Sequence, residues 1–312
     1  MKYLKYIGKR ILVSVILVFA ASSLVFFLMH FALGDPVTLI LGDMMTPETV
    51  HGLKQRLGLL DPLYLQYAKF VFRLVQGNLG VSWYTFDPVA DEVMTVLPNT
   101  LLLTLAAAIV ALILGVPTGI LSACKRNTRM DITARSLVLI GISLPGFVIA
   151  LILIIVFSVY LEWFPTSGFG EFKHIVLPGV SLGVFTAAIM ARITRSSMLD
   201  VILQDYIVSA RAKGLSEKAV IFKHALRNAL IPLITFFGLQ FGVLMGGSVV
   251  TESVFAWPGV GRIIVESIKT RDIPMVQGAI VIYLLVFILI NLIVDIVYVF
   301  VDPRIKLLDE KD

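Results

Sequence analysis

The sequence SARAKGLSEKAVIFKHALRNALIP, residues 209–232, is a basic stretch that separates two strongly apolar parts of the chain. It contains five Lys or Arg residues and one Glu. The residues before its glycine favour a helix that starts near Ser197, and Gly214 suits the left-handed conformation that ends a helix. Ser216 suits the cap of a second helix that runs to about Leu230. The stretch therefore predicts a helix, a sharp turn and a second helix, neither of them apolar enough to insert into a bilayer.

The composition of the whole chain is typical of an integral membrane protein. Hydrophobic residues make up 58% and charged residues 15%, and the mean hydropathy is +0.94, which no single core with a wettable surface accommodates. Apolar runs long enough to cross a hydrocarbon core of about 30 Å occur six times. They lie approximately at 11–33, 100–123, 137–161, 175–191, 229–250 and 277–301. The sequence predicts an all-α integral membrane protein with six transmembrane helices.

The first apolar run follows Lys and Arg residues, as a signal peptide does, but it is about 23 residues long and lacks a small-residue cleavage site. We therefore expect it to remain as a span. Lys and Arg in short loops are retained on the cytoplasmic side of the membrane. With six spans, the face that carries both termini would hold 18 of the 26 Lys and Arg residues. This distribution predicts cytoplasmic termini and a cytoplasmic location for residues 209–232.

The net charge of +5 is explained by this topology and by contact with anionic membrane lipids, so no nucleic-acid partner is expected. Residues 34–99 form a predicted extracytoplasmic insertion with two short amphipathic helices. These are TPETVHGLKQRLGL at 46–59, with Thr46 as a cap, and LYLQYAKFVFRLVQG at 63–77. A loop of this length usually has a function. Composition leaves open whether it covers the outer mouth, receives a partner or lies passively on the membrane.

The sequence contains no motif or residue spacing that is typical of a catalytic site or a metal site. Cys124 is the only cysteine, and the four histidines lie in four segments without metal-ligand spacing. The chain has no phosphate-binding glycine loop and no hydrolase motif. We predict no catalytic residue, no metal ligand and no cofactor bound by this chain.

Asp295 is the only acidic residue deep in a predicted span, and Asn291 lies one turn before it on the same face. An intramembrane carboxylate suggests a function by default. Because Asp295 is close to the cytoplasmic end of its span, a shallow structural position is the favoured interpretation. We keep both residues as candidates for a role in gating or packing.

Glycines repeat every four residues in three of the predicted spans, which gives each a smooth stripe for close helix approach. For each stripe considered by itself, static packing between helices is the favoured interpretation. The alternative is a contact along which helices slide during gating. The stripes are Gly115/Gly119, Gly179/Gly183 and Gly238/Gly242/Gly246.

The stretch DYIVSARAKGLSEKAVIFKHALRNALIPLIT at 205–235 resembles the cytoplasmic signature loop of permease subunits of bacterial ATP-binding-cassette importers. The similarity is to the dipeptide, oligopeptide and nickel group, and to dipeptide- or glutathione-type members that are the first of two permeases. Further collinear matches run along the chain. They include LGLLDPLYLQY at 57–67, LPNTL at 97–101, ISLPGF at 142–147, ARITRSSMLDV at 191–201, FAWPGVGR at 255–262 and VDPRIK at 301–306.

This resemblance implies a heteromeric importer in the bacterial inner membrane. An extracytoplasmic binding protein delivers the substrate, a second homologous permease completes the passage, and two cytoplasmic ATPases use ATP and Mg. The implied domains are residues 1–33 with the cytoplasmic N-terminus and first span, 34–99 as the insertion, and 100–312 as a five-span importer domain. That domain would contain the coupling loop 197–229.

In this family the loop docks into the ATPase, so the resemblance implies a set of coupling residues at the corresponding positions. Val208 and Ser209 depart from the Glu and first Ala of the family motif. The polar contact that the Glu would make must then come from Asp205, Arg211 or Lys213. The full implied set is Asp205, Ser209, Ala210, Arg211, Ala212, Lys213, Gly214, Leu215 and Ser216.

The expected function is import of short peptides, including glutathione, by alternating access driven by the partner ATPases. Import of nickel or a metal chelate by the same machinery is the alternative. An ion-coupled secondary transporter would need more intramembrane charges and inverted repeats, and a membrane-embedded enzyme would need convergent catalytic groups. The sequence favours neither of these.

Overall fold

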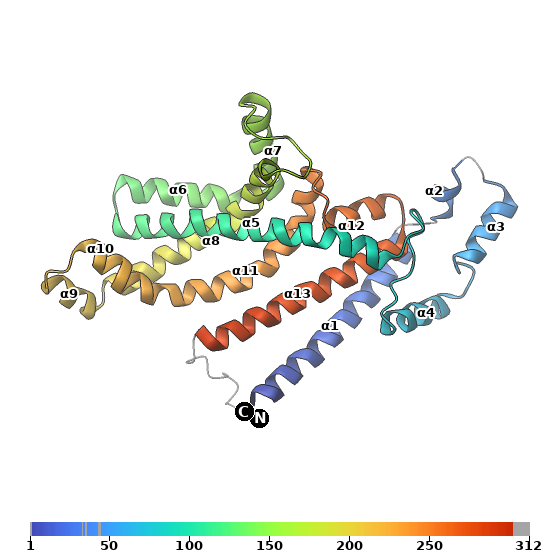
Figure 1. Ribbon diagram of the computed structural model, residues 1–312, viewed down its shortest axis with the longest axis horizontal. Coiled ribbons are helices and arrows are strands. Elements are labelled where there is room, and N and C mark those ends of the chain that lie inside the picture. The colour runs from blue at the N-terminus through green and yellow to red at the C-terminus, as the bar shows by residue number, and fades with distance from the viewer. Residues whose placement is uncertain (1, 33, 35, 43–44, 302–312) are drawn as a thin grey trace. The chain divides into compact units, whose positions relative to one another are not determined.

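The computed structural model describes residues 2–32, 34, 36–42 and 45–301, and these residues form an all-helical protein (Figure 1). In the described part, residues outside helices form turns and one isolated bridge between Val81 and Pro88. The helices are α1 Lys2–Ala32, α2 Val37–Leu41, α3 Pro47–Arg56, α4 Leu63–Val75, α5 Val89–Cys124, α6 Arg129–Ser143, α7 Gly146–Leu153, the π-helix η2 Ile154–Tyr160, α8 Phe172–Ile202, α9 Asp205–Ala212, α10 Glu217–Ala219, the π-helix η3 Val220–Ala225, α11 Leu226–Val254, α12 Val260–Lys269 and α13 Ile273–Val301.

Five stretches of helix in the described residues are long and apolar enough to cross a membrane. They are Leu12–Phe31, Val89–Cys124, Phe172–Ile202, Pro232–Val254 and Ile273–Val294. These stretches agree with five of the six apolar runs predicted from the sequence.

The remaining predicted span, 137–161, is broken. Helix α6 and the continuous pair α7–η2 meet at an angle of 108°, so they make a sixth span only if the bent pair counts as one. The break follows from Pro145, which lacks a backbone N–H and forces the residue before it out of the helical region. Leu144 accordingly has extended backbone angles, with φ −86° and ψ 131°.

The chain divides into two compact units. The first unit comprises residues 1–98 and 258–288, and the second comprises residues 99–257 and 289–312. Within the first unit, the two short helices predicted in the insertion are present as α3 and α4. The Thr46 hydroxyl caps α3 by accepting from the Thr49 N–H at 3.2 Å, as the sequence predicts.

Helix α4 packs on α1 in the first unit through aromatic side chains. The rings of Phe70 and Phe26 stack with centroids 5.3 Å apart, and Tyr67 stacks on Phe27 at the same distance. The hydroxyls of Tyr67 and Ser23 lie 2.7 Å apart. These contacts fix the insertion to the end of the first apolar helix.

A buried carboxylate, that of Asp272, joins residues 82–83 to the start of α13 in the first unit. Asp272 accepts from the Ser82 hydroxyl at 2.5 Å and from the Trp83 N–H at 3.1 Å. It also accepts from the Met275 N–H at 3.2 Å, which satisfies a donor in the first turn of α13. Segments nearly two hundred residues apart in sequence are thereby held together.

The second unit is built on close packing of α5 against α8. A Cβ atom added to Gly115 would lie 2.7 Å from the Ala187 carbonyl oxygen, and one added to Gly183 would lie 2.6 Å from the Ala107 carbonyl oxygen. No side chain fits at such distances from backbone atoms. Two of the three predicted glycine stripes therefore serve the packing of these two helices.

The third stripe, on α11, has mixed surroundings. Gly238 is half-buried and Gly242 is buried, whereas Gly246 is exposed and a Cβ atom added there would meet nothing within 4 Å. Asn291 on α13 is half-buried. Asp295 lies outside the residues whose side chains the structure describes.

Candidate functional site

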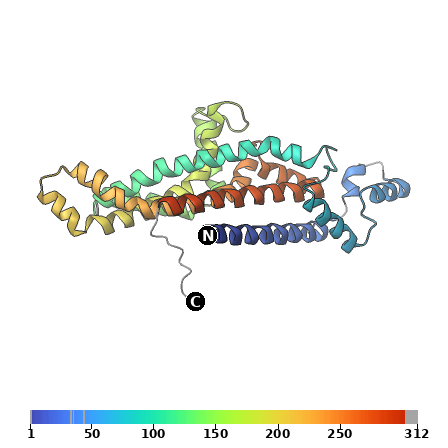
Figure 2. The ribbon, with the colours of Figure 1, turned by 60° about the horizontal axis from the view of Figure 1, so that its bottom comes forward.

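The candidate site is the loop of residues 203–225, which joins α8 to α11 and projects as a helical hairpin at one end of these helices (Figure 1 and Figure 2). The sequence predicts one continuous helix from Ser197 to Lys213, and this is wrong. Helix α8 ends at Ile202, and α9 begins at Asp205 after a turn. The Gln204 amide donates to the Asp200 carbonyl at 3.2 Å and so satisfies one of the free carbonyls at the end of α8.

The turn itself is formed as predicted. Gly214 has φ +78°, the left-handed conformation that favours glycine. The Gly214 N–H donates to the Arg211 carbonyl at 2.9 Å, and the Leu215 N–H donates to the Ala210 carbonyl at 3.4 Å, which is the Schellman pattern of a helix end. The Ser216 hydroxyl then accepts from the Ala219 N–H at 3.4 Å and caps the next helix.

The second arm of the hairpin differs from the regular α-helix predicted to run to Leu230. Only Glu217–Ala219 are α-helical before the π-helix Val220–Ala225, which continues directly into α11. The two arms are joined by a hydrogen bond of 2.7 Å from the Asn228 amide to the Tyr206 hydroxyl. The second arm is therefore an extension of α11, whereas the first arm is separated from α8 by a turn.

An ion pair closes the tip of the hairpin. Arg211 donates two hydrogen bonds to the carboxylate of Glu217, from Nε at 3.1 Å and from the terminal nitrogen at 2.7 Å. The hydrogen bond from Arg211 lowers the pKa of Glu217, and the same bond raises the pKa of Arg211. Both groups are charged at neutral pH and hold the tip together.

The predicted coupling residues divide into an inward and an outward set. Ala210 is 6% exposed and packs, with Ile207, Val220 and Ala225, in a cluster that includes Ile120 of α5 and Met198 of α8. Ala210 therefore contributes to the root of the hairpin and is not available at its surface, unlike the other residues of the implied coupling set. The outward set is exposed: Asp205, Ser209, Arg211, Ala212, Lys213, Gly214, Leu215 and Ser216.

Large apolar side chains lie exposed among the outward set. Val208, Phe222 and Leu203 are 57%, 60% and 69% exposed, and Leu215 is 42% exposed. The sequence analysis did not single out Phe222 and Leu203. Their signal is an apolar residue in a helix that is too polar to insert into a membrane. Exposed apolar side chains among cations make this hairpin suitable for contact with another protein.

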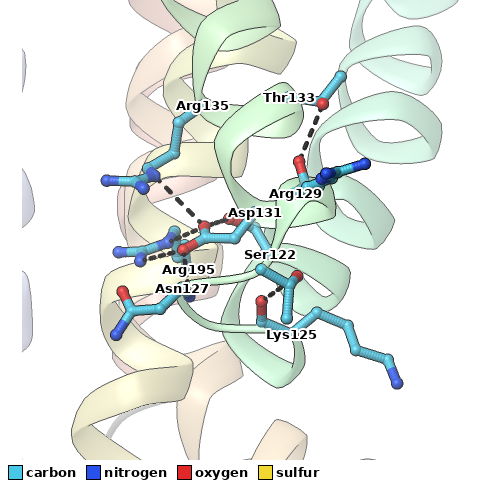
Figure 3. A network of polar contacts seen from close by, with 9 residues as sticks. Ser122, Lys125, Asn127, Arg129, Asp131, Thr133, Arg135 and Arg195 are labelled. Carbon is cyan, nitrogen blue, oxygen red and sulfur yellow. Dashed lines mark hydrogen bonds and ion pairs between the residues drawn. The ribbon is translucent and has the colours of Figure 1, made fainter.

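A buried ion pair lies below the hairpin, where α5, α6 and α8 meet (Figure 3). Asp131 at the start of α6 is fully buried and accepts from Nε of Arg195 on α8 at 2.9 Å and from its terminal nitrogen at 3.0 Å. The Ser122 hydroxyl of α5 donates to the same carboxylate at 2.5 Å, and the Asn127 N–H donates at 3.0 Å. Arg135 lies 3.4 Å away. Helices α5, α6 and α8 are thus joined through one carboxylate.

This buried pair was not predicted from the sequence, in which Arg195 and Arg135 contribute only to the excess of basic residues on one face of the membrane. The available signal was an acidic residue among the basic residues that follow the second apolar run. Among the described residues, no group of three or more His, Cys, Asp or Glu side chains could hold a metal ion.

Comparison with known proteins identifies the family. The family model described as "Binding-protein-dependent transport system inner membrane component" matches residues 115–307, and the model of the N-terminal part of such membrane components matches residues 3–104. The glutathione transport system permease protein GsiC of Escherichia coli O6:H1 is 45% identical over 97% of this chain and 99% of its own length. GsiC of Shigella boydii serotype 4 is 44% identical over the same shares.

Solved structures share the fold. The MetNI methionine ABC transporter in inward-facing conformations aligns with a TM-score of 0.59 and 21% identity, over 68% of this chain and 96% of the transporter chain. An amino acid ABC transporter aligns with a TM-score of 0.52 and 16% identity, over 69% and 95% of the two chains. The chain therefore belongs to the inner-membrane permease components of binding-protein-dependent ABC importers, and it is a multi-pass membrane subunit that is not itself an ATPase.

Proposed function

We propose that the hairpin of residues 203–225 is the element through which partner ATPases drive this permease. The observation that carries this proposal is that the hairpin exposes the large apolar side chains of Val208, Leu215 and Phe222 and also the cations of Arg211 and Lys213. Exposed apolar side chains are more stable when they are buried in a groove of another protein than when they are in contact with water. Its packed root, formed around Ala210 and Ile207, gives the hairpin a firm connection to the membrane helices.

The complex that we propose contains this chain, a second homologous permease, two ATPases that use ATP and Mg, and an extracytoplasmic binding protein. In this proposal the chain has six spans and cytoplasmic termini, which would put the hairpin on the ATPase side and residues 34–99 on the binding-protein side. The excess of Lys and Arg on the hairpin face supports this orientation. Anionic lipids would contact the same basic face.

Alternating access is the mechanism that we propose for this complex. ATP binding closes the ATPases, their movement displaces the hairpins, and the membrane helices open outward to receive substrate. Hydrolysis resets them inward. The stripe Gly238/Gly242/Gly246 on α11, with Asn291 and Asp295 on α13, is proposed to line or adjoin the moving seam. The open surroundings of Gly246 support a role outside static packing within this chain.

The coupling proposal is tested by Gly214→Val in the reconstituted complex. A Cβ atom at this position would meet nothing within 4 Å, so the only obstacle is the left-handed backbone, which is unfavourable for valine by about 1–2 kcal/mol. We expect membrane insertion and assembly to persist while ATP hydrolysis loses its link to uptake. Gly214→Asn, which tolerates the conformation better, is the matched control and should retain most uptake. Normal uptake by the valine variant at normal expression would overturn the assignment.

Short peptides, with glutathione as the leading candidate, are the proposed cargo. The supporting observation is the 45% identity to permeases named for glutathione transport. Nickel or a metal chelate remains the second candidate within the resemblance, and no metal-ligand group in the described residues favours it.

Selection of cargo is proposed to reside mainly in the binding protein. Exchange of only that partner for a related one with a different preference should change what is imported. If the cargo stays the same after the exchange, with docking shown to be intact, the permease contains a selective site of its own.

A further inference from the structure

A cavity of about 340 Å³ lies in the first unit, between α3, α4 and the first turns of α13. This volume is at the lower end of the range for small-molecule sites. Aromatic rings form part of its wall, among them Phe70 of α4, Phe26 of α1 and Trp83. The permease function described above leaves this cavity without a role.

The rim of the cavity carries an excess of positive charge. Arg56, Lys69 and Arg73 line it, and Asp61 is the one acidic residue among the lining residues. Asp61 is matched by Lys69, with 2.6 Å between Oδ2 and Nζ. Arg56 and Arg73 have no ion-pair partner within the part of the chain that the structure describes. These three cations are a large share of the eight Lys and Arg residues predicted to lie on the extracytoplasmic side.

A second, independent feature is the side chain of Gln277, which lines the cavity from α13. Gln277 is only 7% exposed, and its Nε2 has no acceptor in the described structure. Buried amide donors normally have a partner, so an unsatisfied one in a cavity wall suggests an acceptor that arrives with a ligand. The two free guanidinium groups and this amide all favour an oxygen-bearing anion.

We propose that this cavity binds a carboxylate of a short peptide. This inference rests on the proposed import function, because that function supplies the short peptides that the cavity would meet. Arginine pairs with a carboxylate through two parallel hydrogen bonds, which suits Arg56 or Arg73, and the Gln277 amide donates a further bond. The aromatic wall accommodates the apolar part of the peptide. A membrane phosphate presents the same anionic oxygens, but the volume and the aromatic wall favour a peptide.

The test uses the assembled importer in nanodiscs of phosphatidylcholine, without binding protein. Equilibrium dialysis measures binding of the dipeptide Ala-Glu and of Ala-Gln amide, which has a similar shape and no carboxylate. We expect saturable binding of Ala-Glu and at least tenfold weaker binding of the amide. Arg73→Gln should weaken Ala-Glu binding at least fivefold, whereas Lys173→Gln, an exposed cation outside the cavity, should leave it unchanged.

Gln277 supplies a second arm of the test that does not depend on the rim. Gln277→Leu should weaken Ala-Glu binding without lowering the thermal stability of the complex, because the amide has no partner to lose. Gln277→Glu should abolish binding by placing a negative charge in the wall. Equal binding of the two dipeptides, or wild-type affinity in Arg73→Gln, would overturn the inference.

Two further outcomes separate the possible sources of failure. If Ala-Glu does not bind, and Arg73→Gln instead reduces association of phosphatidylglycerol with the complex, the cavity is a lipid site and the inference is wrong. If Ala-Glu does not bind while uptake with the binding protein is intact, this inference fails and the import function stands. If Ala-Glu binds as expected while no peptide is taken up, the import function fails instead.

Discussion

Two arginine–carboxylate pairs, each with two hydrogen bonds, lie in opposite surroundings. One joins α6 to α8 and is called the base here, and the other is at the tip of the hairpin of residues 203–225. At the base, Asp131 is fully buried and Arg195 lies 2.9 Å and 3.0 Å from its oxygens. At the tip, Arg211 and Glu217 are joined at 3.1 Å and 2.7 Å, but their side chains are 38% and 58% exposed.

Burial changes what such a pair does for the protein. An exposed pair gains little, because water screens the charges and two flexible side chains must be ordered. A buried pair is costly to assemble, and it is still more costly to break, because the remaining charge has no water to solvate it. The base therefore holds α5, α6 and α8 in one arrangement. The pair at the tip stabilises the turn only weakly, so contact with a partner protein could change the conformation of the turn at a small cost in free energy.

The largest expected effect is on the base. Arg195→Met would leave the Asp131 carboxylate buried with two hydrogen-bond donors and the longer ion pair to Arg135 at 3.4 Å. We expect a loss of about 3–5 kcal/mol of stability, measured by thermal unfolding of the purified complex. Arg192→Met, an exposed arginine one turn earlier on α8, is the matched control and should have little effect.

The asymmetry of the buried pair sharpens this test. Arg195 is 23% exposed at its side chain, so it retains some water when Asp131 is replaced. Asp131→Asn should therefore destabilise the protein less than Arg195→Met. The double variant Asp131→Leu with Arg195→Met should recover part of the loss, because no buried charge remains. Unchanged unfolding in Arg195→Met would show that the pair does not hold the base.

An intermediate effect is expected from the glycines that let α5 and α8 approach. Gly183→Val would push a side chain against the Ala107 carbonyl, and we expect overpacking to cost at least about 1–3 kcal/mol of stability. Gly146→Val at the start of α7 is exposed, meets open space and is the matched control. Thermal unfolding and assembly yield measure the difference.

Gly242→Leu tests the proposed moving seam against this static packing. If α11 slides during gating, this variant should change the basal ATPase activity of each assembled complex. If it only lowers the amount of complex, like Gly183→Val, the gating role of the stripe is wrong.

The smallest expected effect is at the tip. Glu217→Gln removes an exposed pair, so stability should barely change, and the small change should vanish in high salt. The lowered pKa of Glu217 also sets a pH window. Its contribution is complete above the ordinary value of 4.5 and is lost as the pH falls through the lowered pKa in the folded protein. Hydrogen exchange of the turn amides from pH 7 down to pH 2 would detect the loss below pH 4.5, and a change near pH 7 would contradict it.

The features that local chemistry determines could be predicted from the sequence. The left-handed Gly214, the capping residues Ser216 and Thr46, and five apolar spans follow from one residue type or one run of residues. The inner-membrane importer family was also identified correctly from short collinear motifs. In each case the signal lies in a residue, a continuous run of residues or a short motif, and no contact between distant segments is needed to recognise it.

The features that depend on tertiary packing could not be predicted in the same way. The partnership of Asp131 with Arg195 joins positions 64 residues apart. Ala210 is an ordinary helix former in the sequence, and it is buried by packing in the cluster that includes Ile120, Met198 and Val220. The break between α8 and α9 has no Pro or Gly to mark it, since Leu203 and Gln204 occupy the turn. Pro145 marks the break between α6 and α7, but one residue does not determine the angle of 108° between them.

If the hairpin couples partner ATPases to the membrane helices as proposed, the unequal attachment of its two arms gives the coupling a preferred direction. The second arm runs through η3 directly into α11 with no turn between them, so a push on Glu217 would pass into α11, at least as far as Pro232. The first arm meets α8 at a two-residue joint, which bends before it twists the helix beyond it. We expect a displaced tip to rotate α11 first, while α8 and the helices tied to it through Asp131 act as the fixed pivot. In a hairpin attached in this way, the connection to α11 would move with the tip, and the turn at residues 203–204 would bend.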